Sequence, residues 1–337
     1  MRVSTLTQVI LIVLAVVIVT AIGVGAWFYR YTVTPVGGSD KTVAVWIKPG
    51  QGFFETIDQL QGLGLIRHPE RFRWLAYLKG LERRVRAGEY ALSASMSPQQ
   101  ILETLVHGET VVHKVVVAEG ATLARIGELL ERAGLMSKQA FVRAATNPDV
   151  AAALGLEGTT LEGYLFPETY HFFKGVTPGG VINKMVAQFR SVFTPAWAQR
   201  ARAMGLSIHE VVTLASIVEK ETADPRERPL IAAVFLNRLK RKMRLESDPT
   251  VIYGLKSFDG NLTQRDLKTL TPYNTYRIKG LPPGPICNPG RASIEAVLFP
   301  ADAPYLYFVS KNDGTHHFSR TLAEHNRMVR QYQLRRH

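Results

Sequence analysis

Two glutamates stand at the end of an apolar helical stretch, where a carboxyl group could act as an acid. Residues 215–222 read ASIVEKET, and Glu219 and Glu221 close the stretch. On a helical wheel both glutamates lie beside apolar positions and not on the polar stripe. A carboxyl group beside apolar side chains resists ionisation and is suited to donating a proton. Periodicity does not choose between the two, and Lys220 or Arg226 could instead pair with either at the surface.

A second set of carboxylates alternates with aromatic residues in LEGYLFPETYHF, residues 161–172. With a period of two, one face carries Glu162, Tyr164, Phe166 and Glu168. A proline within the segment limits it to an edge strand or a loop. Aromatic rings stack on sugars and carboxylates accept hydrogen bonds from hydroxyl groups, so this face suits a saccharide. A half-buried hairpin with a solvated acidic edge explains the pattern equally well.

The elements around these residues can be predicted from periodicity and breaker residues. A helix is expected over 207–222, with a polar stripe that includes Ser216, and another helix follows it. The stretch 274–290 has four prolines and three glycines. It is long for a structureless loop, and such loops tend to line sites.

Composition restricts the class of protein and of partner. The 337 residues are 46% hydrophobic and 20% charged, which is ordinary for a globular protein with a full core. A formal net charge of +13 favours an anionic lipid or an acidic polymer as partner, but no nucleic-acid-binding motif occurs, so nucleic acid is not expected. Cys287 is the single cysteine, so no intramolecular disulfide can form. Neither HExxH nor CxxC occurs, and we expect no metal and no cofactor.

The N-terminal segment is predicted to be a membrane anchor. Residues 9–28 contain no charged side chain, and about 20 apolar residues are needed to cross the hydrocarbon core. Trp27, Tyr29 and Tyr31 lie at the end of this run, as aromatic residues do at membrane interfaces. The run is longer than the core of a cleavable signal peptide. A short tail before a large body favours a single pass with the tail inside and the body outside.

An internal repeat follows the membrane segment. Residues 45–66 and 115–136 match at a spacing of seventy residues, with Gly50 opposite Gly120. Each copy predicts a strand, a glycine turn and an amphipathic helix that ends at a glycine. Strand–helix units of this size outside a membrane are a common shape for glycan-binding modules.

The expected fold class is α+β, with four parts along the chain. They are a tail and transmembrane helix (1–30), a Pro/Gly/Ser linker (31–40), a strand–helix repeat module (41–155) and a larger α+β domain (156–337).

Seven motifs in a fixed order resemble those of the endolytic murein transglycosylases, the MltG/YceG-like family of bacterial cell envelopes. They read LEGYLFPETY, ASIVEKET, FLNRL, ESDPTVIYGL, NTY, GLPPGPICNPG and YFV…DGTHHFS…EHN, and they lie between about residues 160 and 326. The upstream repeat is similar to the LysM-like region of that family, and the single N-terminal span also fits. The resemblance therefore implies that 41–155 is a LysM-like module and 156–337 a catalytic domain.

The resemblance also implies an activity and a place in the cell. It implies a lyase, held in the cytoplasmic (inner) membrane, with its body on the periplasmic side. Such an enzyme cleaves the β-1,4 bond between N-acetylmuramic acid and N-acetylglucosamine within nascent peptidoglycan strands, which ends their elongation, and leaves 1,6-anhydromuramyl ends. The resemblance, and not the helical wheel, selects Glu219 as the catalytic residue. One carboxyl group suffices, because it can protonate the leaving oxygen and then take the proton of the muramyl O6 hydroxyl.

Further motif residues are candidates for sugar subsites, although each also has a structural explanation as a cap, a turn residue or part of the core. Ser216, one turn before Glu219, could hydrogen-bond the substrate or the acid. The other candidates are Glu162, Tyr164, Glu168, Asn237, Asp248, Tyr253, Asn274, Tyr276 and Asn288.

Two other functions fit parts of the sequence. A murein-binding scaffold held at the membrane would need the repeat region but no acid. A lysozyme-type hydrolase would use Glu219 as its acid, with Glu221, Asp224 or Asp248 supporting the attack of water. The expected partners are glycan strands and the plasma membrane, and the family's link to growing strands adds a murein synthase as a candidate.

Overall fold

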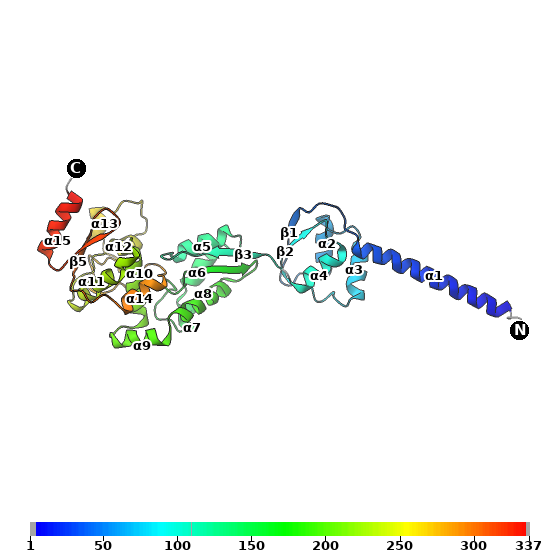
Figure 1. The fold of residues 1–337 in the computed structure, drawn as a ribbon, viewed down its shortest axis with the longest axis horizontal. Coiled ribbons are helices and arrows are strands. Elements are labelled where there is room, and N and C mark those ends of the chain that lie inside the picture. Colours follow the sequence, from blue (N-terminus) through cyan, green and yellow to red (C-terminus); the bar gives the residue numbers. More distant parts are fainter. Residues whose placement is uncertain (1–4, 109, 335–337) are drawn as a thin grey trace. The chain divides into compact units, whose positions relative to one another are not determined.

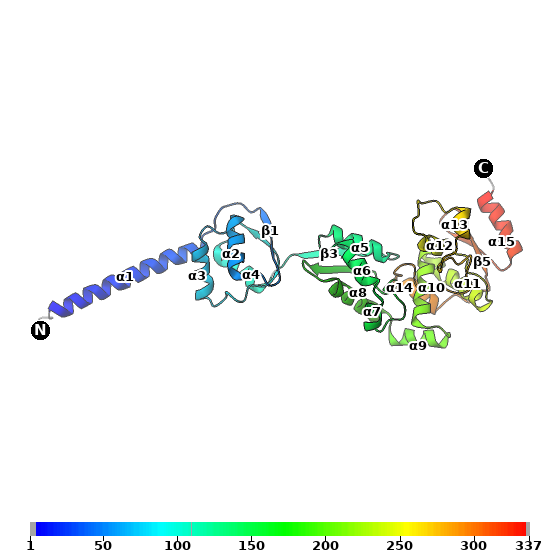
Figure 2. The ribbon, with the colours of Figure 1, turned by 180° about the vertical axis from the view of Figure 1, so that it is seen from behind.

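The computed structural model describes residues 5–108 and 110–334, and the chain divides into two compact units. Unit 1 comprises Met1–His113 with Phe173–Gly175, and unit 2 comprises Lys114–Phe172 with Val176–His337. Figures 1 and 2 show the ribbon from two opposite sides. Each unit mixes helices with short strands, as the α+β class requires.

The elements of unit 1 are α1 (Thr5–Val33), β1 (Thr42–Ile47), α2 (Phe53–Gly62), α3 (Pro69–Leu78), β2 (Gly88–Ser93) and α4 (Pro98–His107). Strand β3 (Val112–Val116) begins at the end of this unit and is hydrogen-bonded to β4 (Thr169–Phe173). The elements after β3 are α5 (Leu123–Arg132), α6 (Lys138–Ala145), α7 (Pro148–Ala153), β4 (Thr169–Phe173), α8 (Pro178–Val192), α9 (Pro195–Ala203), α10 (Ile208–Glu221), the 3-10 helix η1 (Pro225–Glu227), α11 (Arg228–Lys240), α12 (Asp248–Gly254), α13 (Gln264–Lys268), α14 (Arg291–Leu298), β5 (Tyr307–Ser310), β6 (His316–Ser319), α15 (Leu322–Val329) and the π-helix η2 (Arg330–Leu334).

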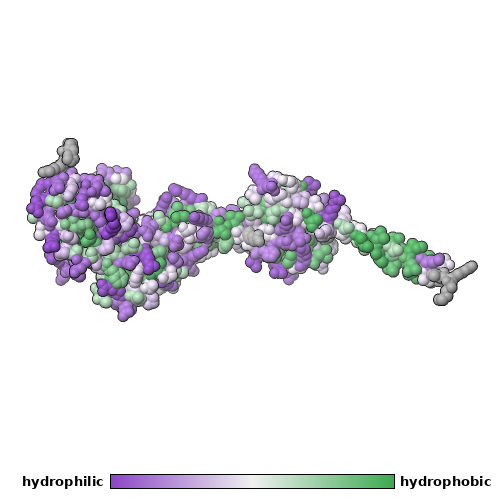
Figure 3. Space-filling model, viewed as in Figure 1, coloured by the Kyte–Doolittle hydropathy of each residue, from purple (hydrophilic) through white to green (hydrophobic). Residues whose placement is uncertain are grey.

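Helix α1 is long and apolar enough to cross a membrane, and its side chains are mostly exposed. Figure 3 shows the hydrophobic surface that runs along it. The helix ends at Val33, a few residues beyond the boundary expected at residue 30. In the same unit β1 and β2 pair antiparallel, and a buried core that includes Val45, Tyr90 and Leu105 packs between this hairpin and its helices.

The internal repeat has the predicted local structure in both copies. The first copy is β1, a turn and α2, and the second is β3, a turn and α5. Both turns contain a glycine with positive φ, Gly50 at 82° and Gly120 at 74°. Both helices are followed by a left-handed glycine, Gly64 at φ 70° and Gly134 at φ 68°, which satisfies carbonyl groups at the helix end. The prediction of a strand, a glycine turn and a glycine-ended helix is confirmed.

The two copies belong to different units, whereas the sequence placed both in one module of residues 41–155. The chain divides at His113 and Lys114, and residue 155 lies inside unit 2. The reason is that the second copy shares a continuous core with later elements. Ile126 and Leu130 of α5 belong to the same buried cluster as Leu161 and Met185.

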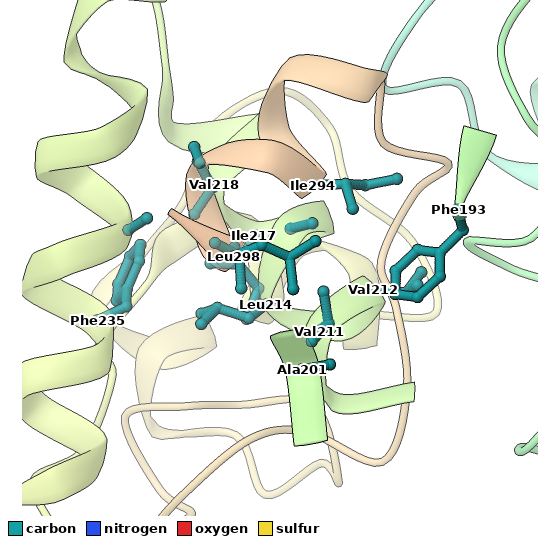
Figure 4. Packing of buried hydrophobic residues seen from close by; sticks show 14 of the residues in the cluster. Phe193, Ala201, Val211, Val212, Leu214, Ile217, Val218, Phe235, Ile294 and Leu298 are labelled. Carbon is teal, nitrogen blue, oxygen red and sulfur yellow. The ribbon is translucent and has the colours of Figure 1, made fainter. Parts of the chain in front are cut away.

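Helix α10 lies in the second buried cluster of unit 2, together with residues of α11 and α14. Figure 4 labels five of its side chains, which belong to the same buried cluster as Phe235 of α11 and Ile294 and Leu298 of α14. The five are Val211, Val212, Leu214, Ile217 and Val218. Ser207 caps the start of the helix and forms a capping box with Glu210. The helix predicted over 207–222 is thus confirmed.

The proline-rich segment 274–290 covers the polar stripe of α10. The Ser216 hydroxyl accepts a hydrogen bond from the Ile286 N–H at 3.0 Å, and the Cys287 thiol donates to the Ser216 carbonyl at 3.3 Å. Gly163, with φ +89°, lets the chain approach this contact, because a Cβ there would lie 2.8 Å from Val212 Cγ1 and closer still to Pro285.

Substituting Gly163 with alanine is therefore expected to lower the free energy of unfolding by about 3 kcal/mol, from backbone strain and overpacking together. Gly134→Ala is the matched control, since its φ is also positive (+68°) but its Cβ would meet no atom within 4 Å. That control should cost only about 1 kcal/mol. Thermal unfolding of the full chain in detergent, followed by circular dichroism, measures both. Equal losses in the two variants would contradict the close packing at Gly163.

Candidate active site

Glu219 lies in the last turn of α10, and its side chain is 8% exposed. One carboxylate oxygen, Oε2, accepts a hydrogen bond of 2.9 Å from the N–H of Gly290, the residue that caps α14. The other oxygen, Oε1, lies 3.5 Å from Nη2 of Arg228 at the start of α11. Both oxygens are therefore held, one by a cation and one by an amide at the positive end of a helix.

A second carboxyl group, Glu119, lies beside Glu219 and was not predicted from the sequence. It belongs to the glycine turn of the second repeat copy, and its Oε2 lies 3.7 Å from Arg228 Nη2. A Cβ on Gly290 would overlap the Glu119 carboxyl group, so the two residues are in contact. Burial and the neighbouring Glu219 raise the pKa of Glu119, whereas the Arg228 charge lowers it. Since half of the Glu119 side chain is exposed, this is the side from which a ligand can approach.

A short backbone bridge brings the two carboxyl groups together. The Gly120 N–H donates to the Asn288 carbonyl at 2.9 Å, and the Asn288 N–H donates to the Ala121 carbonyl at 2.9 Å. This antiparallel bridge joins the turn that carries Glu119 to the segment that carries Gly290. The Lys220 ammonium group contacts the Gly120 carbonyl at 3.4 Å, which adds a second cation to this end of α10.

Three of the predicted residues meet in a buried network behind the bridge. Glu162 is 3% exposed, and its carboxyl group accepts from the Leu123 N–H at 3.2 Å, the Asn288 side-chain amide at 3.0 Å and the Tyr253 hydroxyl at 3.3 Å. Asn288 also accepts from the Leu165 N–H at 2.9 Å. Burial raises the pKa of Glu162 to about 7 in spite of these donors. Glu162, Tyr253 and Asn288 therefore support the site from behind.

The structure does not place Glu162, Tyr164 and Glu168 on one exposed face. The strand begins only at Thr169, so a period of two does not apply to the residues before it. Tyr164 is buried, donates to the Glu157 carbonyl and lies 2.9 Å from Nδ1 of His209. Glu168 is exposed.

Ser216 is fully buried, and its hydroxyl is hydrogen-bonded to the Thr213 carbonyl and the Ile286 N–H and not to Glu219.

Three of the remaining candidates make hydrogen bonds within the fold. Asn237 donates to the carbonyl groups of residues 303 and 305. Asn274 is buried and donates to the carbonyl groups of residues 267 and 269. Asp248 is the first residue of α12, and it accepts a hydrogen bond from Tyr276 at 2.7 Å.

The carboxylates expected to assist a hydrolase are engaged elsewhere. Glu221 accepts a hydrogen bond of 2.5 Å from the Ser247 hydroxyl, and burial raises its pKa to about 7. With Asp248 and Tyr276 it lines a separate cavity of about 440 Å³. Asp224 pairs with Arg226 at 2.7 Å. The carboxyl group that shares a cation with Glu219 is that of Glu119.

Glu119 could have been found by comparing the two repeat copies. It occupies the position of Pro49 in the first copy, so a carboxyl group appears in the second turn beside a glycine that both copies share. No comparable pattern in the sequence indicated Arg228. Among residues 5–108 and 110–334, no group of three or more His, Cys, Asp or Glu side chains is arranged to hold a metal ion.

The raised pKa of Glu162 predicts a pH-dependent stability. Between the ordinary carboxyl pKa and about pH 7, the folded chain keeps the Glu162 proton and the unfolded chain loses it. The free energy of unfolding should therefore fall as pH rises through this window, by about 3 kcal/mol from this group.

Glu162→Gln, which keeps an acceptor without the charge, is expected to flatten this slope. Unfolding of both chains in detergent from pH 5 to 8 is the measurement. Glu221→Gln serves as the matched control, because the pKa of Glu221 is also raised to about 7 and its loss should remove a similar but separate part of the slope. An unchanged slope in Glu162→Gln would mean that the carboxyl group is ionised in the folded protein.

Known proteins similar to this one match most of its length. The family model described as YceG-like family matches residues 45–331. An endolytic murein transglycosylase of Bacillus subtilis is 32% identical over 91% of this chain and 90% of its own length. One of Streptococcus pneumoniae strain D39 is 30% identical over 94% of this chain, which spans 64% of that longer protein.

A solved structure agrees with these matches. The 2.6 Å crystal structure of a yceG-like protein from Listeria monocytogenes is 33% identical, with a TM-score of 0.59. The match covers 86% of this chain and all of that one. Because the family model matches most of the chain, the chain belongs to the YceG-like family.

Proposed function

We propose that this protein is a membrane-anchored endolytic lytic transglycosylase of peptidoglycan, with Glu219 as its general acid and base. The observation that carries the proposal is the environment of Glu219, a carboxyl group at the end of a buried helix with a cation, an amide and a second carboxyl group around it. Relatives named endolytic murein transglycosylases, similar over nearly the whole chain, support the substrate class.

The proposed reaction needs one group that gives a proton and takes one back. Protonated Glu219 donates to the glycosidic oxygen between N-acetylmuramic acid and N-acetylglucosamine. The muramyl O6 hydroxyl attacks C1 of the same sugar, and Glu219 accepts the O6 proton as the 1,6-anhydro ring closes. The nucleophile is part of the substrate, so the protein supplies mainly proton transfer and orientation.

The contacts of Glu219 fit the step in which it gives up its proton. The Gly290 amide and Arg228 stabilise the carboxylate that forms when the proton leaves. Glu119 lies against the same guanidinium, so one cation faces both carboxyl groups.

Glu119 also favours a second candidate function, hydrolysis. Hydrolases of glycosides usually employ two carboxyl groups, and this site contains two. In that case Glu119 would activate water, and the product would be a reducing end. The products therefore distinguish the two reactions.

The remaining parts of the proposal concern location and partners. Helix α1 would hold the protein in the cytoplasmic membrane as a single-pass anchor, with the body on the periplasmic side where glycan strands are made. The two strand–helix repeats would contact glycan in the manner of LysM-like modules. A murein synthase is the proposed protein partner, because cleavage of nascent strands must occur where they emerge.

Glu219→Gln is expected to lower cleavage by at least about 10³-fold, because the amide cannot donate or accept the transferred proton. Mass spectrometry of murein strands incubated with the full chain in detergent would count new anhydromuramyl ends. Glu221→Gln is the matched control, as its side chain faces Ser247. Comparable activity in Glu219→Gln and the unmodified chain would refute the assignment. Reducing ends formed with uptake of water would establish the hydrolase instead.

Glu119→Gln is expected to keep cleavage within about 10-fold of the unmodified chain, with anhydromuramyl ends as the product, because transglycosylation needs the carboxyl group of Glu219 alone. Arg228→Gln is expected to lower cleavage more, because the guanidinium stabilises the carboxylate that forms on Glu219. The exposed Glu295→Gln of α14 is the control. Loss of cleavage at every pH in Glu119→Gln, with reducing ends as the normal product, would instead indicate the hydrolase.

A further inference from the structure

Helix α3 in unit 1 has large apolar side chains that stay exposed among the described residues of that unit. Trp74 is 58% exposed, Tyr77 61% and Leu78 66%. Trp74 and Tyr77 contact each other edge to face, with ring centroids 5.9 Å apart. The other side of α3 is already used, because Phe72 and Leu75 are buried in the core of the unit. A contiguous exposed patch of this kind marks an interaction surface.

This patch faces the apolar length of α1. Trp74 and Leu78 line one wall of an open wedge of about 950 Å³, and α1 residues from Val16 to Phe28 line the other. The start of α3 is tied to the end of α1, because the Arg71 guanidinium lies 4.0 Å from the centre of the Trp27 ring. The Tyr31 hydroxyl also donates to the carbonyl of the residue just before α3 at 3.1 Å. The medium that contacts this side of α1, whether water or lipid, therefore also contacts Trp74 and Leu78.

The residues in and around α3 carry an excess of positive charge, which favours a negatively charged partner surface. Residues 67–86 contain seven Lys or Arg and two Glu. Arg73 lies over the ring of exposed Phe54 at 4.6 Å, which places a cation beside another apolar side chain. Aromatic and aliphatic side chains mixed with arginines are typical of helices that lie in the headgroup region of anionic membranes.

We propose that α3 is a second membrane contact that lies in the plane of the bilayer interface where α1 emerges. Trp74, Tyr77 and Leu78 enter the boundary between headgroups and acyl chains, and the surrounding arginines bind anionic phospholipid headgroups. The inference rests on the proposed anchoring of the chain by α1, because the wedge between the two helices is filled by lipid only if α1 spans the bilayer. Its consequence is that unit 1 rests on the membrane surface and does not move freely on a tether.

Depth-dependent quenching tests the proposal on the full chain in vesicles of phosphatidylcholine with phosphatidylglycerol. An environment-sensitive fluorophore is attached to Leu78→Cys, and the native Cys287 is buried and protected from labelling. Two matched positions are labelled separately, Val17→Cys within α1 and the exposed Gln61→Cys at the end of α2. Quenching by lipids with a nitroxide near the headgroup, or at the end of an acyl chain, is compared with quenching by aqueous iodide.

We expect the label at position 78 to be quenched several-fold more by nitroxide lipid than the label at position 61, and several-fold less by iodide. Iodide quenching at position 78 equal to that at position 61 would overturn the proposal. Protection from iodide without nitroxide quenching would also overturn it, since a protein surface would then cover the patch. The label at position 17 separates the two hypotheses, because its failure to respond to the nitroxide at the end of the acyl chain would refute the anchor itself.

A second variant ties the effect to the arginines. Replacing Arg73 by Gln should reduce the nitroxide quenching at position 78 in anionic vesicles and change it little in pure phosphatidylcholine. An equal reduction in both lipids would contradict the role of anionic headgroups.

Discussion

The burial of one carboxyl group, that of Glu162, is the constraint on which the architecture of unit 2 depends. A carboxyl group removed from water needs donors, and here they come from three distant segments: the start of α5, Asn288 and Tyr253 of α12. Satisfying it therefore fixes the second repeat copy against the proline-rich segment. That contact creates the bridge between Ala121 and Asn288, and the bridge places Glu119 and Gly290 beside Glu219. The candidate site is thus a consequence of polar groups buried behind it.

Helix α10 distributes its two terminal carboxyl groups to different surroundings. Two residues along a helix correspond to about 200° of rotation, so Glu219 and Glu221 point to opposite sides. Glu219 meets a cation, an amide and Glu119, whereas Glu221 meets Ser247 and the cavity beside Asp248. Their chemistry therefore differs, although both border the same apolar core.

Much of the local structure could be predicted from the sequence, because helix periodicity and glycine placement act within a few residues. The limits of α10 and the two repeat copies follow from such signals. The pairing of Glu119 with Glu219 could not be predicted in this way. It depends on a bridge between Ala121 and Asn288, which lie 167 residues apart in the chain. The alternation at Glu162 and Tyr164 was misleading because these residues are not in a strand. They are buried by segments far away in the sequence, such as those of Tyr253 and Asn288.

The single cysteine illustrates a different consequence of how the proline-rich segment packs. The Cys287 thiol is buried against the Ser216 carbonyl, and burial raises its pKa. A thiol without a partner in its own chain can be oxidised only by an outside molecule or by the thiol of a neighbouring copy, and proteins confined to a membrane surface meet their neighbours often. Closing the segment over α10 removes that reaction, because the thiolate is the reactive form and it is neither accessible nor readily formed. The packing that shapes the candidate site thereby also protects the chain from covalent dimerisation.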